Sequence, residues 1–217
     1  MEEVHDNMRG EADGVIDPNK EVRGTSEARQ EIEGPRIYVA SLSDYNAGIL
    51  HGSWLGADLG AEVLHEGIAE MLADSPTMRR YGEVAEEFAI HDFEGFGQVH
   101  LDEYESIERV AQMARGIAEH GEPFGAWWAM ESRDDADWGD VQSQFTEQYL
   151  GEFSSLEEYA EQDLDDMGFD IDELPDIPEG LRPYVKIDIE AWARDMELGG
   201  DVTTVESRSG VYVFWPG

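Results

Sequence analysis

The first part of the fold is decided by the stretch Arg36-Ile37-Tyr38-Val39-Ala40-Ser41. This stretch is rich in β-branched and aromatic residues, which is typical of a β-strand. Two further strands are expected at residues 50–55 and 87–93, the latter followed by glycines at positions 95 and 97. Residues 44–48 contain Asp, Asn and Gly and therefore predict a turn after the first strand.

Residues 61–73 have the spacing of an amphipathic helix. The apolar residues that share one face of this helix are Val63, Leu64, Ile68, Met71 and Leu72. Carboxylates recur every fourth residue on another face, at Glu62, Glu66 and Glu70. Because a helix turns once in 3.6 residues, this spacing lines the carboxylates up along one side. We expect the helix to stop at Asp74-Ser75-Pro76 and to complete a small α+β unit.

The second half of the chain predicts helices followed by a hairpin. Helical spacing of apolar residues occurs over 103–119, 122–130 and 140–150. The capping-box pattern Ser154-Ser155-Leu156-Glu157 opens a further helix that ends near residue 164, and another is expected at 188–198. Residues 201–215 predict a hairpin that turns at Ser209-Gly210.

These elements predict an α+β fold. We expect a mobile acidic extension over residues 1–34, an N-terminal α+β domain over 35–95, a helical middle domain over 96–150 and a C-terminal α+β domain over 151–217. The chain is 41% hydrophobic and contains 6 Trp, 8 Tyr and 8 Phe, which is enough apolar material for a packed core.

The net charge is the unusual property of this chain. Its 51 Asp and Glu residues oppose 14 Lys and Arg residues, which gives a formal charge of −37. Such a chain repels nucleic acid and anionic membranes, so its partners should be basic. Solubility alone, or a halophilic cytoplasm, would also explain the total. The N-terminus lacks the basic and apolar regions of a signal peptide, and the chain has no Cys, so we expect a cytoplasmic protein.

The distribution of charge is more informative than its total. Residues 35–100 contain 11 acids and 3 bases, whereas residues 101–217 contain 30 acids and 7 bases. No Lys or Arg occurs between Arg133 and Arg182. Aromatic residues such as Phe145 and Tyr159 lie within this base-free window, which indicates a folded acidic surface instead of a low-complexity acidic tract.

Catalytic patterns are weak throughout the sequence. The segment Asp163-Leu164-Asp165-Asp166-Met167-Gly168 resembles the start of a calcium loop, but Met167 and Leu174 stand where ligands are required. His91-Asp92 has no accompanying cluster that would complete a metal site, and Gly95-Phe96-Gly97 lacks the third glycine of a dinucleotide loop. We therefore expect a protein that is not an enzyme, with no catalytic residues, no metal site and no cofactor.

Several blocks of the sequence resemble the ArdA family of antirestriction proteins. They are Pro35-Arg36-Ile37-Tyr38-Val39-Ala40-Ser41-Leu42, Tyr45-Asn46-Ala47-Gly48, Leu50-His51-Gly52-Ser53-Trp54, residues 87–96, Tyr149-Leu150-Gly151-Glu152-Phe153, residues 155–160, residues 189–198, Gly200-Asp201-Val202 and Val211-Tyr212-Val213-Phe214-Trp215. The blocks extend over residues 35–217 in the order of the family. Residues 1–34 lie outside the resemblance.

The resemblance implies an elongated protein of three small α+β domains that copies the shape and charge of bent duplex DNA. It also implies a homodimer formed through the C-terminal part. Members of this family are carried by plasmids, transposons and phages. They occupy the DNA-binding groove of type I restriction-modification enzymes, at the methyltransferase core of specificity and modification subunits. No direct binding to nucleic acid or membrane is expected.

Sixteen acidic residues are the candidates for a DNA-mimicking surface: Glu62, Glu66, Glu70, Asp134, Asp135, Asp137, Asp140, Glu147, Glu157, Glu158, Glu161, Asp165, Asp166, Asp170, Asp172 and Glu173. The terminal hairpin is the candidate for dimerisation, through Val202, Val205, Val211, Val213 and Trp215. It could equally be an ordinary intramolecular sheet edge. A different class of function, an acidic module that sequesters other basic DNA-binding proteins, would use the same charge.

Overall fold

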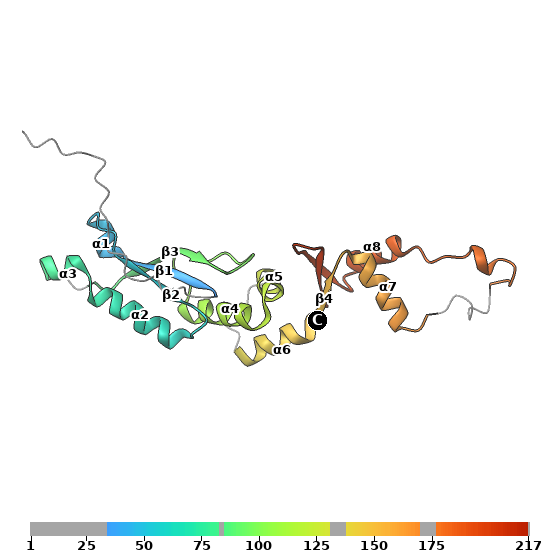
Figure 1. Cartoon of the computed structure of the whole chain (residues 1–217), viewed down its shortest axis with the longest axis horizontal. Helices are drawn as coiled ribbons and strands as arrows, with labels where there is room; N and C mark the ends of the chain where they lie inside the picture. Colours follow the sequence, from blue (N-terminus) through green and yellow to red (C-terminus); the bar gives the residue numbers. More distant parts are fainter. Residues whose placement is uncertain (1–33, 83–84, 131–137, 170–176, 217) are drawn as a thin grey trace, which may run out of the picture. The chain divides into compact units, whose positions relative to one another are not determined.

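A computed structural model describes residues 34–82, 85–130, 138–169 and 177–216 of the chain. These residues form helices and two three-stranded antiparallel sheets (Figure 1). This content confirms the predicted α+β class. None of the helices in these four ranges is long and apolar enough to cross a membrane.

The first sheet contains β1 (Arg36–Ser41), β2 (Gly52–Gly56) and β3 (Phe88–Glu94), with β1 in the centre. All three predicted strands are thus confirmed to within two residues. Ile37 and Val39 of β1 are completely buried, as expected of alternate positions that face a core. Helix α2 (Ala61–Ala73) contacts β1 and β2 and buries Leu64. The bounds of α2 are those predicted from its apolar spacing.

The turn predicted at residues 44–48 is a short helix, α1 (Leu42–Asn46), followed by a turn. The Ser41 hydroxyl caps α1 by accepting a hydrogen bond from the backbone N–H of Asp44 (3.4 Å). A helix that the sequence did not predict, α3 (Pro76–Tyr81), begins directly after α2. Pro76 occupies the first turn of α3, where its missing N–H costs no hydrogen bond.

Three helices follow the first sheet: α4 (Ile107–His120), α5 (Glu122–Met130) and α6 (Trp138–Gln148). The prediction for α5 was correct at both ends. Helix α4 starts four residues later than predicted, because the Ser106 hydroxyl accepts the backbone N–H of Arg109 and fixes the start. Gly116 of α4 lies so close to the Phe124 ring of α5 that the site has no room for a side chain.

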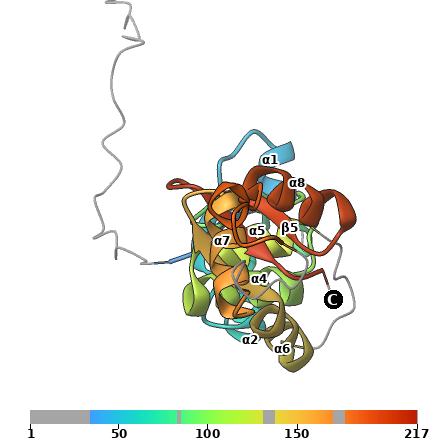
Figure 2. The same ribbon diagram turned by 90° about the vertical axis from the view of Figure 1, so that its right-hand side faces the viewer.

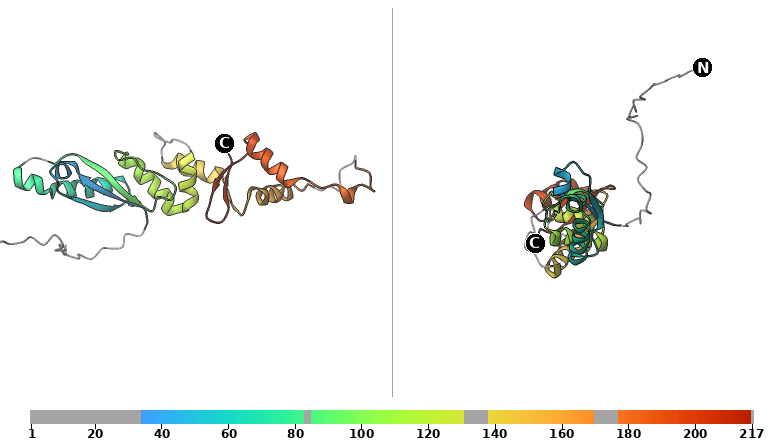
Figure 3. Two further views of the ribbon diagram at one scale, coloured as in Figure 1. Left: turned by 90° about the horizontal axis from the view of Figure 1, so that it is seen from above. Right: turned by 90° about the vertical axis from the view of Figure 1, so that its left-hand side faces the viewer.

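The second sheet contains β4 (Tyr149–Phe153), β5 (Thr203–Glu206) and β6 (Val211–Phe214), with β6 in the centre (Figure 3). The predicted hairpin is confirmed as β5 and β6. The prediction that a helix continues to residue 150 was wrong, because Tyr149 pairs with Phe214 and starts a strand. This pairing partner lies more than sixty residues away in the sequence.

Helices α7 (Leu156–Asp166) and α8 (Ile189–Gly199) lie beside each other (Figure 2). A short 3-10 helix, η2 (Arg182–Tyr184), precedes α8. The N-cap of α7 is Ser155 and not Ser154, since the Ser155 hydroxyl accepts the backbone N–H of Glu158. The capping box is therefore displaced by one residue from its predicted position.

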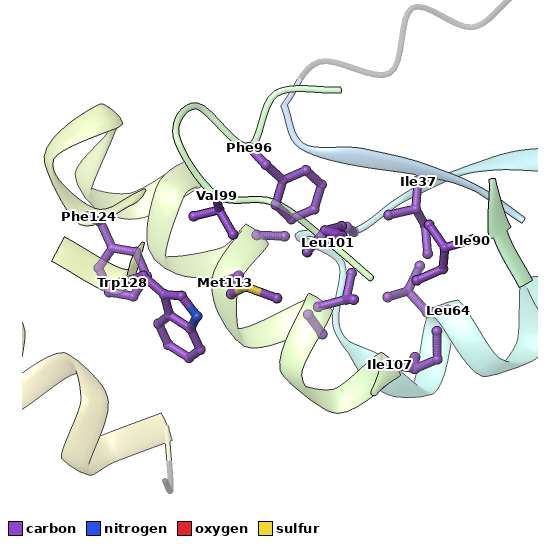
Figure 4. Packing of buried hydrophobic residues seen from close by; sticks show 14 of the residues in the cluster. Ile37, Leu64, Ile90, Phe96, Val99, Leu101, Ile107, Met113, Phe124 and Trp128 are labelled. Carbon is purple, nitrogen blue, oxygen red and sulfur yellow. The ribbon is translucent and has the colours of Figure 1, made fainter. Parts of the chain in front are cut away.

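The main hydrophobic cluster includes residues from both sides of the domain boundary predicted at residue 95. Ile37, Leu64 and Ile90 of the first part pack in the same cluster as Phe96, Met113 and Trp128 of the second (Figure 4). Tyr212 and Phe214 of β6 also belong to this cluster. A smaller cluster around Ala160, Ala193 and Val213 joins α7, α8 and β6. The division into three domains stays a prediction.

Candidate protein-binding surface

Helix α2 presents a row of carboxylates to solvent. Glu62, Glu66 and Glu70 are all exposed, because Leu64 and Ile68 occupy the opposite, buried side of the helix. Within the four described ranges, none of the three carboxylates takes part in an ion pair. The row therefore keeps its full negative charge.

A second group of carboxylates lies on α6 and α7. The members that the structure describes are all exposed: Asp140, Glu147, Glu157, Glu158, Glu161, Asp165 and Asp166. Ala160 and Leu164 form the buried side of α7, so the acids of this helix occupy its remaining faces. The described part of the base-free window is thus a folded surface with exposed carboxylates, as its composition predicted.

Hydroxyl and backbone groups are the hydrogen-bond donors to the carboxylates of α6 and α7 for which the described residues show a donor. Glu158 accepts hydrogen bonds from the Ser154 backbone N–H (2.6 Å) and hydroxyl (2.7 Å). The Ser143 hydroxyl donates in the same way to Glu147 (3.2 Å). Hydroxyl donors leave the negative charge of a carboxylate uncompensated, as they would for a phosphate.

Glu152 belongs to this surface but was not among the candidates. It is exposed on β4 and accepts hydrogen bonds from the hydroxyls of Ser207 (2.6 Å) and Ser209 (2.5 Å) in the hairpin turn. These hydrogen bonds lower the pKa of Glu152. The pKa of Glu158 is lowered by Ser154, and that of Glu157 by Ser155. Because a lowered pKa favours the charged form, these carboxylates stay ionised at neutral pH.

The ion pairs formed by arginine side chains within the described residues lie outside this window. Arg36 pairs with Glu94, Arg79 with Asp74, and Arg208 with Glu122. The remaining pairs of this kind are Arg109–Glu105, Arg115–Glu119 and Arg194–Asp195. These six pairs neutralise carboxylates that lie outside the window.

His65 of α2 pairs with Glu108 of α4 at 3.0 Å. The hydrogen bond from His65, together with the backbone N–H of Glu108 and the Ser106 hydroxyl, lowers the pKa of Glu108 to about 2. Helix α2 contacts α4 directly, so this exposed pair lies over a packed helix–helix contact.

Six of the candidate acids fall outside the residues that the structure describes: Asp134, Asp135, Asp137, Asp170, Asp172 and Glu173. The N-terminal extension predicted over residues 1–34 also falls outside them, apart from Gly34. These assignments stay predictions.

The hairpin residues proposed for dimerisation differ in accessibility. Val202 and Val213 are buried in the cluster between α7, α8 and β6, so their side chains already pack within a single chain. Val205 and Val211 are partly buried, whereas Trp215 is 51% exposed. Strand β5 forms an edge of its sheet. These positions leave Trp215 and the β5 edge as the accessible parts of the predicted contact.

Among the described residues, no three His, Asp or Glu side chains are grouped so that they could hold a metal ion. His91, which the sequence placed beside Asp92, contacts the Tyr45 ring edge-to-face with a centroid distance of 5.0 Å.

Comparison with protein families matches residues 37–210 of the chain to the family described as antirestriction protein (ArdA). This match covers about four-fifths of the 217 residues. No curated protein matches the chain.

Proposed function

The chain belongs to the ArdA antirestriction family, and from this premise we propose that it inhibits type I restriction-modification enzymes by imitating duplex DNA. Family membership implies an antirestriction function and an interaction with a restriction-modification enzyme. The proposal adds the mechanism and the target. The protein would occupy the DNA-binding groove formed by the specificity and modification subunits and so protect incoming mobile DNA.

The observation that supports this proposal most strongly is the exposed acidic surface of α6, β4 and α7, three elements that contain no Lys or Arg. Its described carboxylates face solvent and accept hydrogen bonds from hydroxyl and backbone groups. A surface whose purpose was solubility alone would not require that Lys and Arg be absent between residues 134 and 181. A basic groove that normally holds phosphates would meet a comparable array of fixed negative charges.

The amount of charge is suited to this role. Residues 35–217 carry a formal charge of −31, and duplex DNA carries one negative charge per about 1.7 Å of its axis. The charge of one chain therefore equals that of about 50 Å of duplex, or about 15 base pairs. On α2, Glu62, Glu66 and Glu70 recur every four residues, which is about 6 Å along a helix. The formal charge already subtracts the 10 Lys and Arg residues of this range. The length of duplex is an upper limit, because some of these acids cap helices instead of facing a partner.

Affinity for a basic groove should depend steeply on salt. Binding would release the counterions held by both surfaces, as it does when DNA binds. The carboxylates copy phosphates and not base edges, and phosphate contacts position a duplex without specifying its sequence. We therefore expect inhibition of type I enzymes that recognise different DNA sequences.

The test is to replace Glu157, Glu161, Asp165 and Asp166 of α7 together by their amides. The matched control replaces Glu2, Glu3, Glu11 and Glu27, which changes the net charge equally outside residues 37–210. Competition with duplex DNA for a purified type I methyltransferase should weaken in the α7 variant, and its salt dependence should fall by roughly one unit of slope per lost contact. The control variant should compete like the unaltered protein.

Two results would contradict distributed mimicry. One is equal competition by the α7 variant and its control. The other is a single amide substitution, for example Glu161→Gln, that abolishes inhibition while the protein stays folded. Strong binding of nucleoid-type basic proteins without any displacement of DNA from the methyltransferase would instead support the sequestering module.

We also propose that the protein forms a homodimer through the β5–β6 hairpin. Within the described chain no strand pairs with the outer edge of β5, where the Gln98 side chain donates a hydrogen bond to the carbonyl of Glu206 (2.9 Å). Trp215, which follows β6, is 51% exposed. An open strand edge can pair with another chain, and symmetric pairing of two identical edges gives a closed dimer.

A further inference from the structure

A hollow of about 500 Å³ lies between β3, α1 and the segment that follows β3. Four rings line this hollow, from Tyr45, His91, Phe93 and His100, together with the carboxylate of Glu103. Buried Ile90 and Leu101 also line it. A ring-lined hollow with one carboxylate is chemically distinct from the open carboxylate rows of α2 and α7.

A β-bulge places His91 at this site. Tyr38 pairs with Asp92 and Val39 pairs with Ile90, so His91 has no partner residue on β1. The extra residue changes the alternation of the strand, with Ile90 buried and His91 on the accessible side. Directly before His91, the backbone N–H of Ile90 donates to the carbonyl of Glu103 (2.9 Å). This hydrogen bond holds Glu103 beside β3.

The rings form two edge-to-face pairs. Tyr45 and His91 have a centroid distance of 5.0 Å and an interplanar angle of 77°. Phe93 and His100 have a centroid distance of 5.6 Å and an angle of 75°. Phe93 also contacts Phe96 edge-to-face, with a centroid distance of 5.9 Å. The negative face of an aromatic ring attracts a cation, so a lining of several rings favours a cationic ligand.

The Glu103 carboxylate is available to a ligand. Its side chain is 53% exposed, and the His91 ring lies beside it, with Nε2 at 3.8 Å from Oε1. No Lys or Arg within the described ranges forms an ion pair with Glu103. A cationic group entering the hollow would meet this carboxylate and the rings together.

We propose that this hollow receives an arginine side chain of the basic protein partner. A guanidinium group is planar, stacks on aromatic rings and pairs with a carboxylate, which suits it to this lining better than the compact ammonium of lysine. A nucleotide would be repelled by the formal charge of −37. The inference rests on the proposed function and deepens it. One specific side-chain contact would fix the position of the protein on its partner, whereas the exposed carboxylates attract cations without selecting one position.

The experiment titrates the full-length protein with N-acetyl-arginine methylamide and follows the imidazole resonances of His91 and His100 by NMR. The measurement is made at about pH 8, so that ordinary imidazoles are neutral. The control ligand is N-acetyl-citrulline methylamide, which has a similar shape but no charge. We expect saturable shifts of both imidazoles with the arginine compound only.

Glu103→Gln should weaken this binding about tenfold, which corresponds to about 1.4 kcal/mol. Tyr45→Leu should weaken it as well, while its backbone spectrum stays that of a folded protein. The matched control Glu70→Gln removes the same charge from α2 and should leave the titration unchanged. Equal effects of Glu103→Gln and Glu70→Gln, or equal binding of the citrulline compound, would overturn the proposal.

This titration contains no restriction enzyme, so the two proposals can fail separately. An absence of saturable arginine binding would contradict the proposal that the hollow binds arginine, even if the protein displaces DNA from a methyltransferase. Saturable binding of the arginine compound by a protein that never displaces DNA would contradict the proposed function and still support arginine binding in the hollow.

Discussion

Replacing the buried carboxylate of Asp44 should destabilise the fold more than replacing any exposed acid. Asp44 is completely buried at the junction of α1 and α3. Its carboxylate accepts hydrogen bonds from the Ser75 hydroxyl (2.7 Å) and from the Thr77 backbone N–H (2.8 Å). Hydrogen bonds to a charged group contribute about 1.5–3 kcal/mol each. We therefore expect Asp44→Ala to lower the free energy of unfolding by about 3–5 kcal/mol.

Asp44→Asn removes the negative charge of the side chain but keeps its size and shape. The amide oxygen can still accept from Thr77, but the amide nitrogen must donate to the Ser75 hydroxyl, which already accepts the backbone N–H of Met78 (3.2 Å). The hydroxyl proton of Ser75 then loses its acceptor. We expect a loss of about 1–2 kcal/mol.

The assay is urea unfolding followed by tryptophan fluorescence, with Glu70→Ala as an exposed control expected to change stability by less than about 0.5 kcal/mol.

Burial alone would raise the pKa of Asp44, but the hydrogen bonds from Thr77 and Ser75 lower it well below the ordinary range. The stability due to this charge is therefore present above the unfolded pKa of about 3.9 and is lost as the pH falls through the folded pKa. The difference between the unaltered protein and Asp44→Asn should stay constant from about pH 8 to about pH 5 and shrink below about pH 4. An Asp44→Ala protein as stable as the Glu70→Ala control would refute this reasoning.

Three further predictions concern packing and assembly. Gly116→Ala places a methyl group against the Phe124 ring and should cost about 1–3 kcal/mol in thermal unfolding; an unchanged melting temperature would contradict the close approach of α4 and α5. Glu108→Gln removes the exposed pair with His65 and should cost less than about 1 kcal/mol in urea unfolding, so a loss several times larger would show that this pair holds α2 to α4. Trp215→Glu puts a charge on the accessible end of the hairpin and should weaken the proposed dimer in sedimentation velocity, whereas an unchanged dimer would exclude the hairpin from the contact.

The elements with strong local periodicity were predicted well from the sequence. Helix α2 has the predicted bounds, because the spacing of its apolar residues and the flanking Asp74-Ser75-Pro76 specify them. Helix α5 also has the predicted bounds, although its residues from Phe124 to Trp128 are buried without amphipathic spacing. The three strands of the first sheet were also recognised, since β-branched and aromatic residues dominate β1 and its partners.

Elements that depend on distant partners were missed. Tyr149 and Leu150 suit a helix as well as a strand, and only pairing of β4 with β6 decides between them. Helix α3 is six residues long and begins with Pro76, which the local pattern indicated as the end of the preceding helix. The packing of the second sheet depends on distant residues for the same reason. Alternation in the hairpin identified Val213 as apolar but could not show that α7 and α8 cover it.

The acidic surface was partly predictable and the ring-lined hollow was not. Helical spacing correctly placed Glu62, Glu66 and Glu70 on the solvent side of α2. The contacts of Glu152 with Ser207 and Ser209 join residues more than fifty positions apart, and the bulge at His91 depends on the register of β3 against β1. Both features arise from tertiary pairing, for which local spacing carries no signal.

Competition with DNA for a type I methyltransferase, measured across salt concentration, tests the central claim most directly. A labelled duplex bound to the purified enzyme is displaced by the full-length protein, and the affinity of the protein is determined at each salt concentration. We predict full displacement at low salt and a steep loss of affinity as salt rises, parallel to that of the duplex itself. Failure to displace the duplex at low salt would contradict the proposal that the carboxylates of α2, α6 and α7 act as a substitute for DNA.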